Sequence, residues 1–181
     1  AQMALGFDVF TSGTVWALYT AITIIGIATD EIYAANGILM SVVLLAALGA
    51  SYAYGRLIDR RRGKDLLQLA SVANALTHFA RPLIGSPVAI AVLNVANEAA
   101  TTGYNMAYTR GVFDNADLSG RRVTYIGINE ALSNLGAAVG AGILALLVLL
   151  VSEVRAMEYF FYIAAAVVLL IATARFPLYR K

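Results

Sequence analysis

The sequence contains no cysteine and only one histidine, and each shortage excludes a class of site. Without cysteine there is no disulfide and no thiolate-bound metal, and one histidine cannot form a histidine-rich metal centre. We therefore expect no bound metal. The phosphate-binding pattern G-x-x-x-x-G-K-[ST] is missing, and so is a Ser-His-acid arrangement with a supporting motif. The sequence thus predicts neither an ATP-driven machine nor an enzyme, and it implies no cofactor.

Charged residues are also scarce. They make up 13% of the 181 residues, against about 25% in soluble domains. Hydrophobic residues make up 60% and the mean hydropathy is +0.75, more apolar surface than a globule of this length could bury. Lipid is therefore the expected solvent, and the clustering of the cations argues against nucleic acid as a partner. No basic segment precedes the first apolar run, so we expect no cleavable signal peptide.

Six segments meet the length of about 20 mostly apolar residues that a membrane-spanning helix needs. The expected spans cover residues 8–29, 36–57, 65–84, 86–109, 122–151 and 156–176. The sequence therefore predicts an all-α membrane protein with one domain, residues 1–181. Between the third and fourth spans, Pro82, Gly85 and Pro87 favour a break over one long helix.

The basic residues predict the orientation of this domain. With six spans, one face carries Arg56, Arg60, Arg61, Arg62, Lys64, Arg110, Arg121, Arg122, Arg175, Arg180 and Lys181. The opposite face carries Arg81 and Arg155. Because cytoplasmic loops collect lysine and arginine, we expect the crowded face and both termini to be cytoplasmic. The expected location is a plasma membrane of the prokaryotic type.

The densest basic segment also carries a motif. Residues 55–64 read GRLIDRRRGK and link the second and third spans. This stretch resembles the signature loop of the major facilitator superfamily, G-x-x-x-D-R-x-G-R-[RK], with one additional residue between Asp-Arg and Gly. In each half of that superfamily the loop also follows the second of six spans.

The resemblance implies a single facilitator half, built of two inverted three-helix repeats, and full transporters enclose a midplane site between two such halves. It also implies a latch that holds one conformation of alternating access. The latch residues are Gly55, Asp59, Arg60, Gly63 and Lys64. From the residues themselves, we expect Arg60 to pair with Asp114 or Asp117 at the cytoplasmic end of the fourth span.

Small residues mark the fifth span. The stretch NLGAAVGAGIL, residues 134–144, contains Gly136, Gly140 and Gly142. It is similar to the glycine-rich fifth-helix motif of some facilitator families, without their proline. Ordinary close packing of helices through small residues is sufficient to explain this spacing, so we expect the three glycines to contact a neighbouring helix.

Polar residues recur along the fourth span at spacings of three and four, which places them on one helix face. The stripe contains Asn94, Glu98, Thr101, Asn105 and Tyr108, and is widened by Asn97 and Thr102. A carboxylate facing lipid costs at least about 2.5 kcal/mol, so the stripe faces another helix or an aqueous cavity. A milder stripe in the first span contains Ser12, Trp16, Tyr19 and Thr23. The resemblance implies that both stripes line the cavity, because the first and fourth helices do so in each facilitator half.

Two glutamates are candidates for binding substrate or coupling transport to protons. Glu98 is the first choice, because it lies near the middle of its span. The alternative is a structural glutamate that is hydrogen-bonded within the bundle. Glu130, accompanied by Asn129, Ser133 and Asn134, is the second candidate and lies closer to the cytoplasmic end.

The single histidine lies in the stretch THFARPL, at the outer end of the third span. A lone histidine is more often a packed, hydrogen-bonded residue than a ligand, so we expect His78 to be structural. Arg81 is one of two cations on the outer side, and its long side chain is expected to reach the membrane interface.

These patterns predict secondary-active transport of a small molecule or ion by alternating access. The expected partners are the lipid bilayer and a second six-helix half, in a homodimer, a separate chain or the remainder of a longer chain. An alternative is a non-transporting structural or assembly subunit whose polar stripe docks another membrane protein or a pigment. A small channel formed by oligomers is a third possibility. Uptake that depends on Glu98 separates the first from the second, and ohmic flux would indicate the third.

Overall fold

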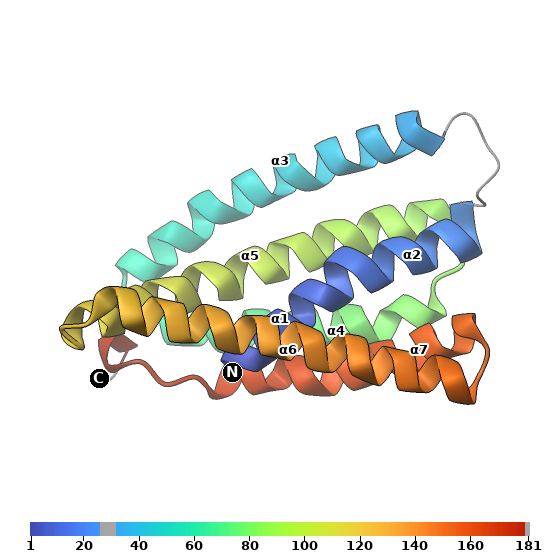
Figure 1. Ribbon diagram of the computed structural model, residues 1–181. Coiled ribbons are helices and arrows are strands. Elements are labelled where there is room, and N and C mark those ends of the chain that lie inside the picture. The colour runs from blue at the N-terminus through green and yellow to red at the C-terminus, as the bar shows by residue number, and fades with distance from the viewer. Residues whose placement is uncertain (26–31, 180–181) are drawn as a thin grey trace.

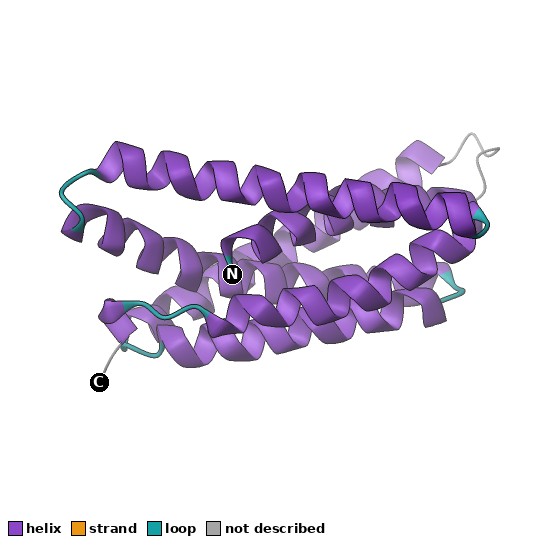
Figure 2. Cartoon of the chain, turned by 60° about the horizontal axis from the view of Figure 1, so that its bottom comes forward, coloured by secondary structure: helices purple, strands orange, loops and turns teal. Residues whose placement is uncertain are grey.

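The computed structural model describes residues 1–25 and 32–179, and in that part of the chain it consists of helices joined by short turns and loops, with no strand (Figures 1 and 2). The first helix is continuous and consists of α1 (Gln2–Phe10), the π-helical η1 (Thr11–Val15), α2 (Trp16–Thr20) and the π-helical η2 (Ala21–Ile25). It begins six residues before the predicted start at Asp8, because the apolar residues 3–7 already pack against α6. Residues 26–29 of the predicted span lie outside the described residues.

Five long helices follow. They are α3 (Ile32–Asp59), α4 (Gly63–Ala80), α5 (Pro87–Leu118), α6 (Arg122–Leu150) and α7 (Glu153–Val168). Short 3-10 helices η3 (Arg81–Leu83), η4 (Leu169–Thr173) and η5 (Pro177–Tyr179) complete the chain. The helix α5 continues nine residues past the predicted end at 109, because its last turns pack against the C-terminal segment.

The predicted break before α5 is confirmed. The turn after η3 leads into Ser86, whose Oγ accepts a hydrogen bond from the backbone N–H of Ala89 at 3.3 Å. Pro87 then occupies the first position of the helix, where its missing N–H leaves no hydrogen bond unmade. One helical segment therefore ends at Leu83, and the next begins at Pro87.

Three stretches of the described chain combine the length and the apolar composition of a membrane-crossing helix: Met40–Asp59, Arg122–Leu150 and Glu153–Thr173. They correspond to the second, fifth and sixth predicted spans. The helices α4 and α5 are less apolar than these three stretches. Together with the first helix, they contribute most of the buried side chains among the described residues.

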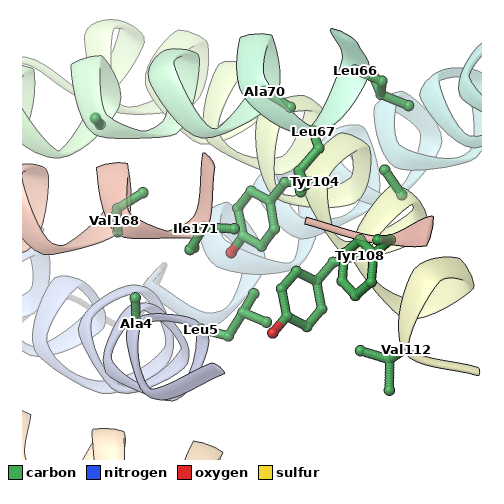
Figure 3. Packing of buried hydrophobic residues seen from close by; sticks show 13 residues of the cluster. Ala4, Leu5, Leu66, Leu67, Ala70, Tyr104, Tyr108, Val112, Val168 and Ile171 are labelled. Carbon is green, nitrogen blue, oxygen red and sulfur yellow. The ribbon is translucent and has the colours of Figure 1, made fainter. Parts of the chain in front are cut away.

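The bundle has two apolar clusters. The first gathers Leu67 of α4, Tyr104 and Tyr108 of α5, and Ile171 of η4 (Figure 3). The second contains Phe7, Val15, Trp16, Tyr19, Ile90, Leu93, Met157, Phe160, Phe161 and Ala164. Both clusters join the first helix and α5 to the C-terminal helices. This packing holds the polar faces of the first helix and α5 in fixed positions.

The turns separate to the two ends of the bundle (Figure 1). The turns at residues 60–62 and 119–121 lie at the end that also carries the C-terminus, whereas the turns at 84–86 and 151–152 lie at the opposite end. Arg61 and Gly120 have positive φ angles of 59° and 67°, and these tight turns reverse the chain within a few residues. The two basic loops of the sequence therefore lie at the same end.

Glycines allow the first helix to approach α6 closely. A Cβ atom added to Gly136 would overlap the backbone of Met3, and one added to Gly6 would overlap the backbone carbonyl of Ser133. At Gly140 the nearest atoms would be the rings of Phe7 and Phe10, each at 3.2 Å. Gly142, in contrast, faces open space among the described residues. Of the three glycines predicted to pack, two therefore lie at a helix contact and one does not.

Candidate functional site

A cavity of about 610 Å³ lies between the first helix, α3 and α5. Its polar lining consists of Asp8, Ser12, Trp16, Thr20, Asn94, Asn97, Glu98, Thr101, Tyr104 and Asn105. Met40 and Val43 of α3 and Ile90 of α5 add apolar walls. The volume falls within the roughly 300–1,000 Å³ typical of small-molecule sites. Parts of the two polar stripes of the sequence, on the first and fourth predicted spans, thus line the same cavity.

The predicted candidate Glu98 lines this cavity and is half-buried. Its position in α5 places it about 17 Å from the start of the helix. The hydroxyl of Thr102 lies 3.5 Å from its Oε1 atom. Asn94, Thr101 and Asn105 line the same cavity, one or two turns away along α5.

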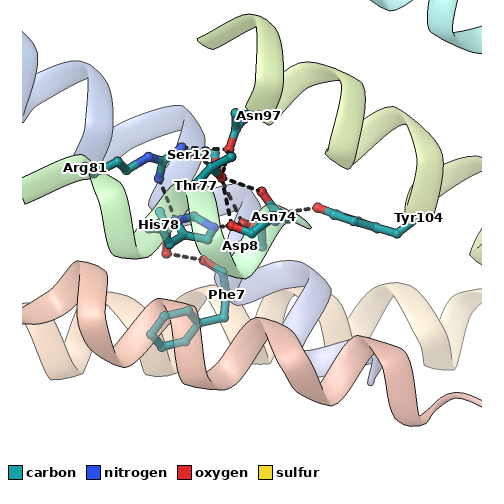
Figure 4. A network of polar contacts seen from close by, with 10 residues as sticks. Phe7, Asp8, Ser12, Asn74, Thr77, His78, Arg81, Asn97 and Tyr104 are labelled. Carbon is teal, nitrogen blue, oxygen red and sulfur yellow. Dashed lines mark hydrogen bonds and ion pairs between the residues drawn. The ribbon is translucent and has the colours of Figure 1, made fainter. Parts of the chain in front are cut away.

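A buried hydrogen-bonded network lies against one wall of the cavity and is centred on Asp8 (Figure 4). Asp8 is 1% exposed. Its Oδ1 atom lies 2.5 Å from Nε2 of His78, and its Oδ2 atom accepts a hydrogen bond from the hydroxyl of Tyr104. The hydroxyl of Ser12 adds a longer contact of 3.4 Å to Oδ1. One carboxylate therefore connects α1, α4 and α5.

Arg81 continues this network from η3. Its Nη1 atom lies 2.8 Å from Nδ1 of His78, and Nη2 donates to Ser12 Oγ and Asn97 Oδ1, at 3.0 Å each. The guanidinium lies 5.0 Å from the ring centre of Trp16, a favourable cation–π distance. Only 1% of Arg81 is exposed. The arginine predicted to reach the membrane interface is instead fully buried, because polar groups on the first helix and α5 supply its acceptors.

The donors of this network determine the tautomer of His78. Arginine has only donors, so Nδ1 of His78 must accept the bond from Arg81 with its lone pair. The ring proton therefore lies on Nε2, which donates to Asp8. His78 is neutral in this arrangement, and it bridges the negative Asp8 and the positive Arg81. Buried charges are tolerated where they are paired and hydrogen-bonded in this way.

The interpretation of His78 as a packed, hydrogen-bonded residue is confirmed: it is 0% exposed and has a partner at each ring nitrogen. Asp8 was not among the residues predicted for a site. One signal was present, since His78 and Arg81 are three residues apart and share one helix face, and such a buried basic pair needs an acid. Asp8 is an acid at the start of an apolar segment, but nothing local connects it to α4.

Some predicted cavity residues lie elsewhere. Tyr19 packs in the second apolar cluster, with its hydroxyl 3.5 Å from Glu158 Oε1. Tyr108 packs edge-to-face against Phe176, with ring centres 5.1 Å apart. Glu130 is exposed on α6. Trp16 does line the cavity, and its Nε1 donates to Asn94 Oδ1 at 2.7 Å.

The loop at residues 55–64 is organised by packing against the C-terminal segment. A Cβ atom on Gly63 would overlap the ring of Tyr179, whose hydroxyl donates to the backbone carbonyl of Ala107 at 2.8 Å. Burial in this contact raises the pKa of the Tyr179 phenol. Phe176 fills the space beside Gly111 in the same way. The C-terminal segment thus ties the 55–64 loop to α5.

The charged residues of that loop do not form the predicted contacts. Within residues 1–25 and 32–179, Arg60 makes no ion pair with Asp114 or Asp117. Asp117 pairs instead with Arg122 at 3.1 Å, because both flank the tight turn between α5 and α6. Asp59 and Arg110 line one depression of about 270 Å³ beside Tyr179. Gly55 is half-buried on α3, and Lys64 is exposed at the start of α4.

Comparisons with known proteins found no match: no family model, no curated protein and no solved structure is similar to this chain. The resemblance of residues 55–64 to the facilitator signature therefore rests on the motif and its position in the chain.

Proposed function

We propose that this chain is one six-helix half of a secondary transporter, and that it moves a small solute by alternating access. The proposal includes six membrane-spanning helices in two inverted three-helix repeats. It places the 60–62 and 119–121 turns and both termini in the cytoplasm of a prokaryotic-type cell. The solute occupies the cavity between the first helix, α3 and α5.

The polar cavity itself is the observation that carries the proposal. Amide, hydroxyl and carboxylate groups line a space of about 610 Å³, in a protein whose other helices carry long apolar faces. Ionisable residues within membrane helices are costly and are typical of substrate and ion pathways. The π-helical turns of the first helix also support a functional site, because such turns are frequent at functional sites. Ser12 and Gly13 of the π-helical η1 lie on the cavity wall.

A second half follows from the same lining. A cavity that contains Glu98 and several amides cannot face lipid without a large free-energy cost, so another protein surface has to cover it. A second copy of the chain or a separate six-helix half would do so, and the cavity would then lie between two halves. Rocking of the halves would open it to one side of the membrane and then to the other.

Single cysteines test alternating access without knowledge of the solute. The chain has no native cysteine, so Thr101→Cys and Asn105→Cys each introduce one thiol into the cavity. We expect a membrane-impermeant maleimide to label both variants from the outside of right-side-out vesicles, and also from the cytoplasmic side of inside-out vesicles. Ser119→Cys and Ser152→Cys, at opposite ends of the bundle, are the reference variants and should each be labelled from one side.

Other labelling patterns would contradict the proposal. Labelling of the cavity variants from neither side, together with stable co-purification of a larger complex, would favour a structural or assembly subunit. Simultaneous labelling from both sides with ohmic current in planar bilayers would favour a channel. Leu149→Cys on the exposed face of α6 controls for reagent that enters the lipid, and it should remain unlabelled.

A further inference from the structure

The charged groups of the cavity all have the same sign. In the part of the chain that the structure describes, two carboxylates, Asp8 and Glu98, line the cavity, and no lysine, arginine or histidine does. The two acids differ in their surroundings. The chemistry of the solute therefore depends on which of them remains available to it.

Asp8 is already neutralised by the protein. Its oxygens accept hydrogen bonds from His78 and Tyr104, with a third contact to Ser12. The positive charge of Arg81 lies on the far side of the His78 ring. Asp8 is 1% exposed, so a solute would have to break this network to reach it. We therefore assign Asp8 to the cavity wall and not to the binding of solute.

Glu98 has no such compensation. Its contact within the bundle is the hydroxyl of Thr102 at 3.5 Å, and no described lysine or arginine lies within ion-pair distance of it. A half-buried carboxylate with low-dielectric walls around it creates a negative potential in the cavity. A cation is the solute that complements such a potential.

The asparagines add a second recognition feature. Asn94 Oδ1 accepts from the indole of Trp16 at 2.7 Å, and Asn97 Oδ1 accepts from Arg81 at 3.0 Å. Because the amide oxygens of Asn94 and Asn97 already have protein donors, the amide nitrogens of these two residues, which are donors, are left to meet a solute. They suit a hydroxyl or carbonyl oxygen on the same molecule. Val43 and Ile90 line the cavity as well and suit its carbon skeleton.

We propose that the solute of this cavity is a small organic cation that also carries an oxygen acceptor, with its charged nitrogen paired with Glu98. An amino alcohol or a quaternary ammonium alcohol has this chemistry. The inference rests on the proposed function, because it names the solute of the same cavity. A neutral molecule of the same shape lacks the charge that Glu98 recognises.

Choline and 3,3-dimethylbutan-1-ol test the role of charge, since the two probes have nearly the same shape and differ in the central atom, nitrogen or carbon. We would measure the binding of each by isothermal titration calorimetry to the full chain in lipid nanodiscs, with tetraethylammonium as a second cation. We expect saturable binding of choline, at least about tenfold tighter than that of the neutral alcohol. Glu98→Gln should weaken choline binding by about tenfold or more.

Glu130→Gln is the matched control, because it makes the same substitution on an exposed face of α6, and it should leave choline binding unchanged. The melting temperature of each variant shows whether it is folded. Equal affinity for choline and the neutral alcohol, no effect of Glu98→Gln in a folded protein, or no binding of either cation would each overturn the inference.

The binding experiment tests the cationic solute, and the cysteine labelling tests alternating access, so either proposal can be contradicted without the other. Labelling from both sides of the membrane without cation selectivity would support the transporter and contradict the cationic solute. Cation binding that depends on Glu98, combined with labelling from one side, would support the binding site and contradict alternating access.

Discussion

Arg81 Nη1 lies 2.8 Å from His78 Nδ1, and the opposite nitrogen of the same ring lies 2.5 Å from Asp8. The imidazole therefore connects a buried cation and a buried anion that do not touch each other directly. This arrangement joins η3 and α4 to the first helix. The positive charge of Arg81 balances the negative charge of Asp8 within this network, so each buried charge depends on the other for compensation.

Substitution of Arg81 should strongly destabilise the protein. Arg81→Met removes the cation and leaves the buried Asp8 uncompensated, a change that typically costs about 3–5 kcal/mol. The free energy of unfolding in a mixed-micelle denaturant titration measures this loss. Arg155→Met, at an exposed position of α7, is the control and should have little effect.

The double variant Asp8→Asn/Arg81→Met separates the pairing of charges from packing. Once both charges are removed, we expect a loss of stability clearly smaller than the sum of the two single losses, since residues in one network are coupled. Additive losses would show that the two side chains contribute independently.

The tautomer of His78 can be observed directly, because it is the only histidine in the chain. In ¹⁵N-labelled protein we expect one neutral imidazole with the proton on Nε2 and a lone pair on Nδ1, since Arg81 can only donate to Nδ1. Solid-state NMR in lipid resolves the two nitrogen shifts. Protonation of both nitrogens would contradict the arrangement. In Arg81→Met this preference for one tautomer should weaken.

The contact between the first helix and α6 predicts that substitution of two glycines of α6 affects stability differently. Gly136→Leu inserts a side chain where even a Cβ overlaps the backbone of Met3, so we expect a loss of at least about 1–3 kcal/mol or failure to fold. Gly142→Leu points into open space and should be tolerated. Melting temperatures of the two variants check the prediction, and similar values would place the helix contact elsewhere.

The packing of Gly63 against Tyr179 predicts a compensating pair. Gly63→Ala should destabilise the protein by about 1–3 kcal/mol, because the added methyl overlaps the tyrosine ring. A second substitution, Tyr179→Ala, should remove that overlap, so that the effect of Gly63→Ala becomes much smaller in its presence. Gly55→Ala is the control, since the nearest atom would be the flexible end of Met106 at 4.0 Å. Equal effects of Gly63→Ala with and without Tyr179 would contradict this contact.

The sequence alone predicted much of the helical architecture. Apolar runs, turn residues and the proline at position 87 are local signals, because a helix forms and ends through contacts within a few residues. The stripe at Asn94, Glu98, Thr101 and Asn105 was also visible, since a spacing of three and four defines a helix face. As predicted, this stripe and part of the first helix line one cavity. Tyr108, one turn further along the same stripe, lies in the apolar core, because periodicity does not show where a cavity ends.

The tertiary structure decided the rest. Asp8 and His78 are 70 residues apart, and Asp8 and Tyr104 are 96 apart, so no local pattern could connect them. Arg81 looked like an interfacial cation for the same reason: its acceptors lie on other helices. The sequence determined which residues carry charge and which face of each helix they occupy. Only the packing of the helices decided that one acid is neutralised within the wall and that Glu98 faces the cavity without a cation, because compensation of charge depends on distances between segments that are remote in the chain.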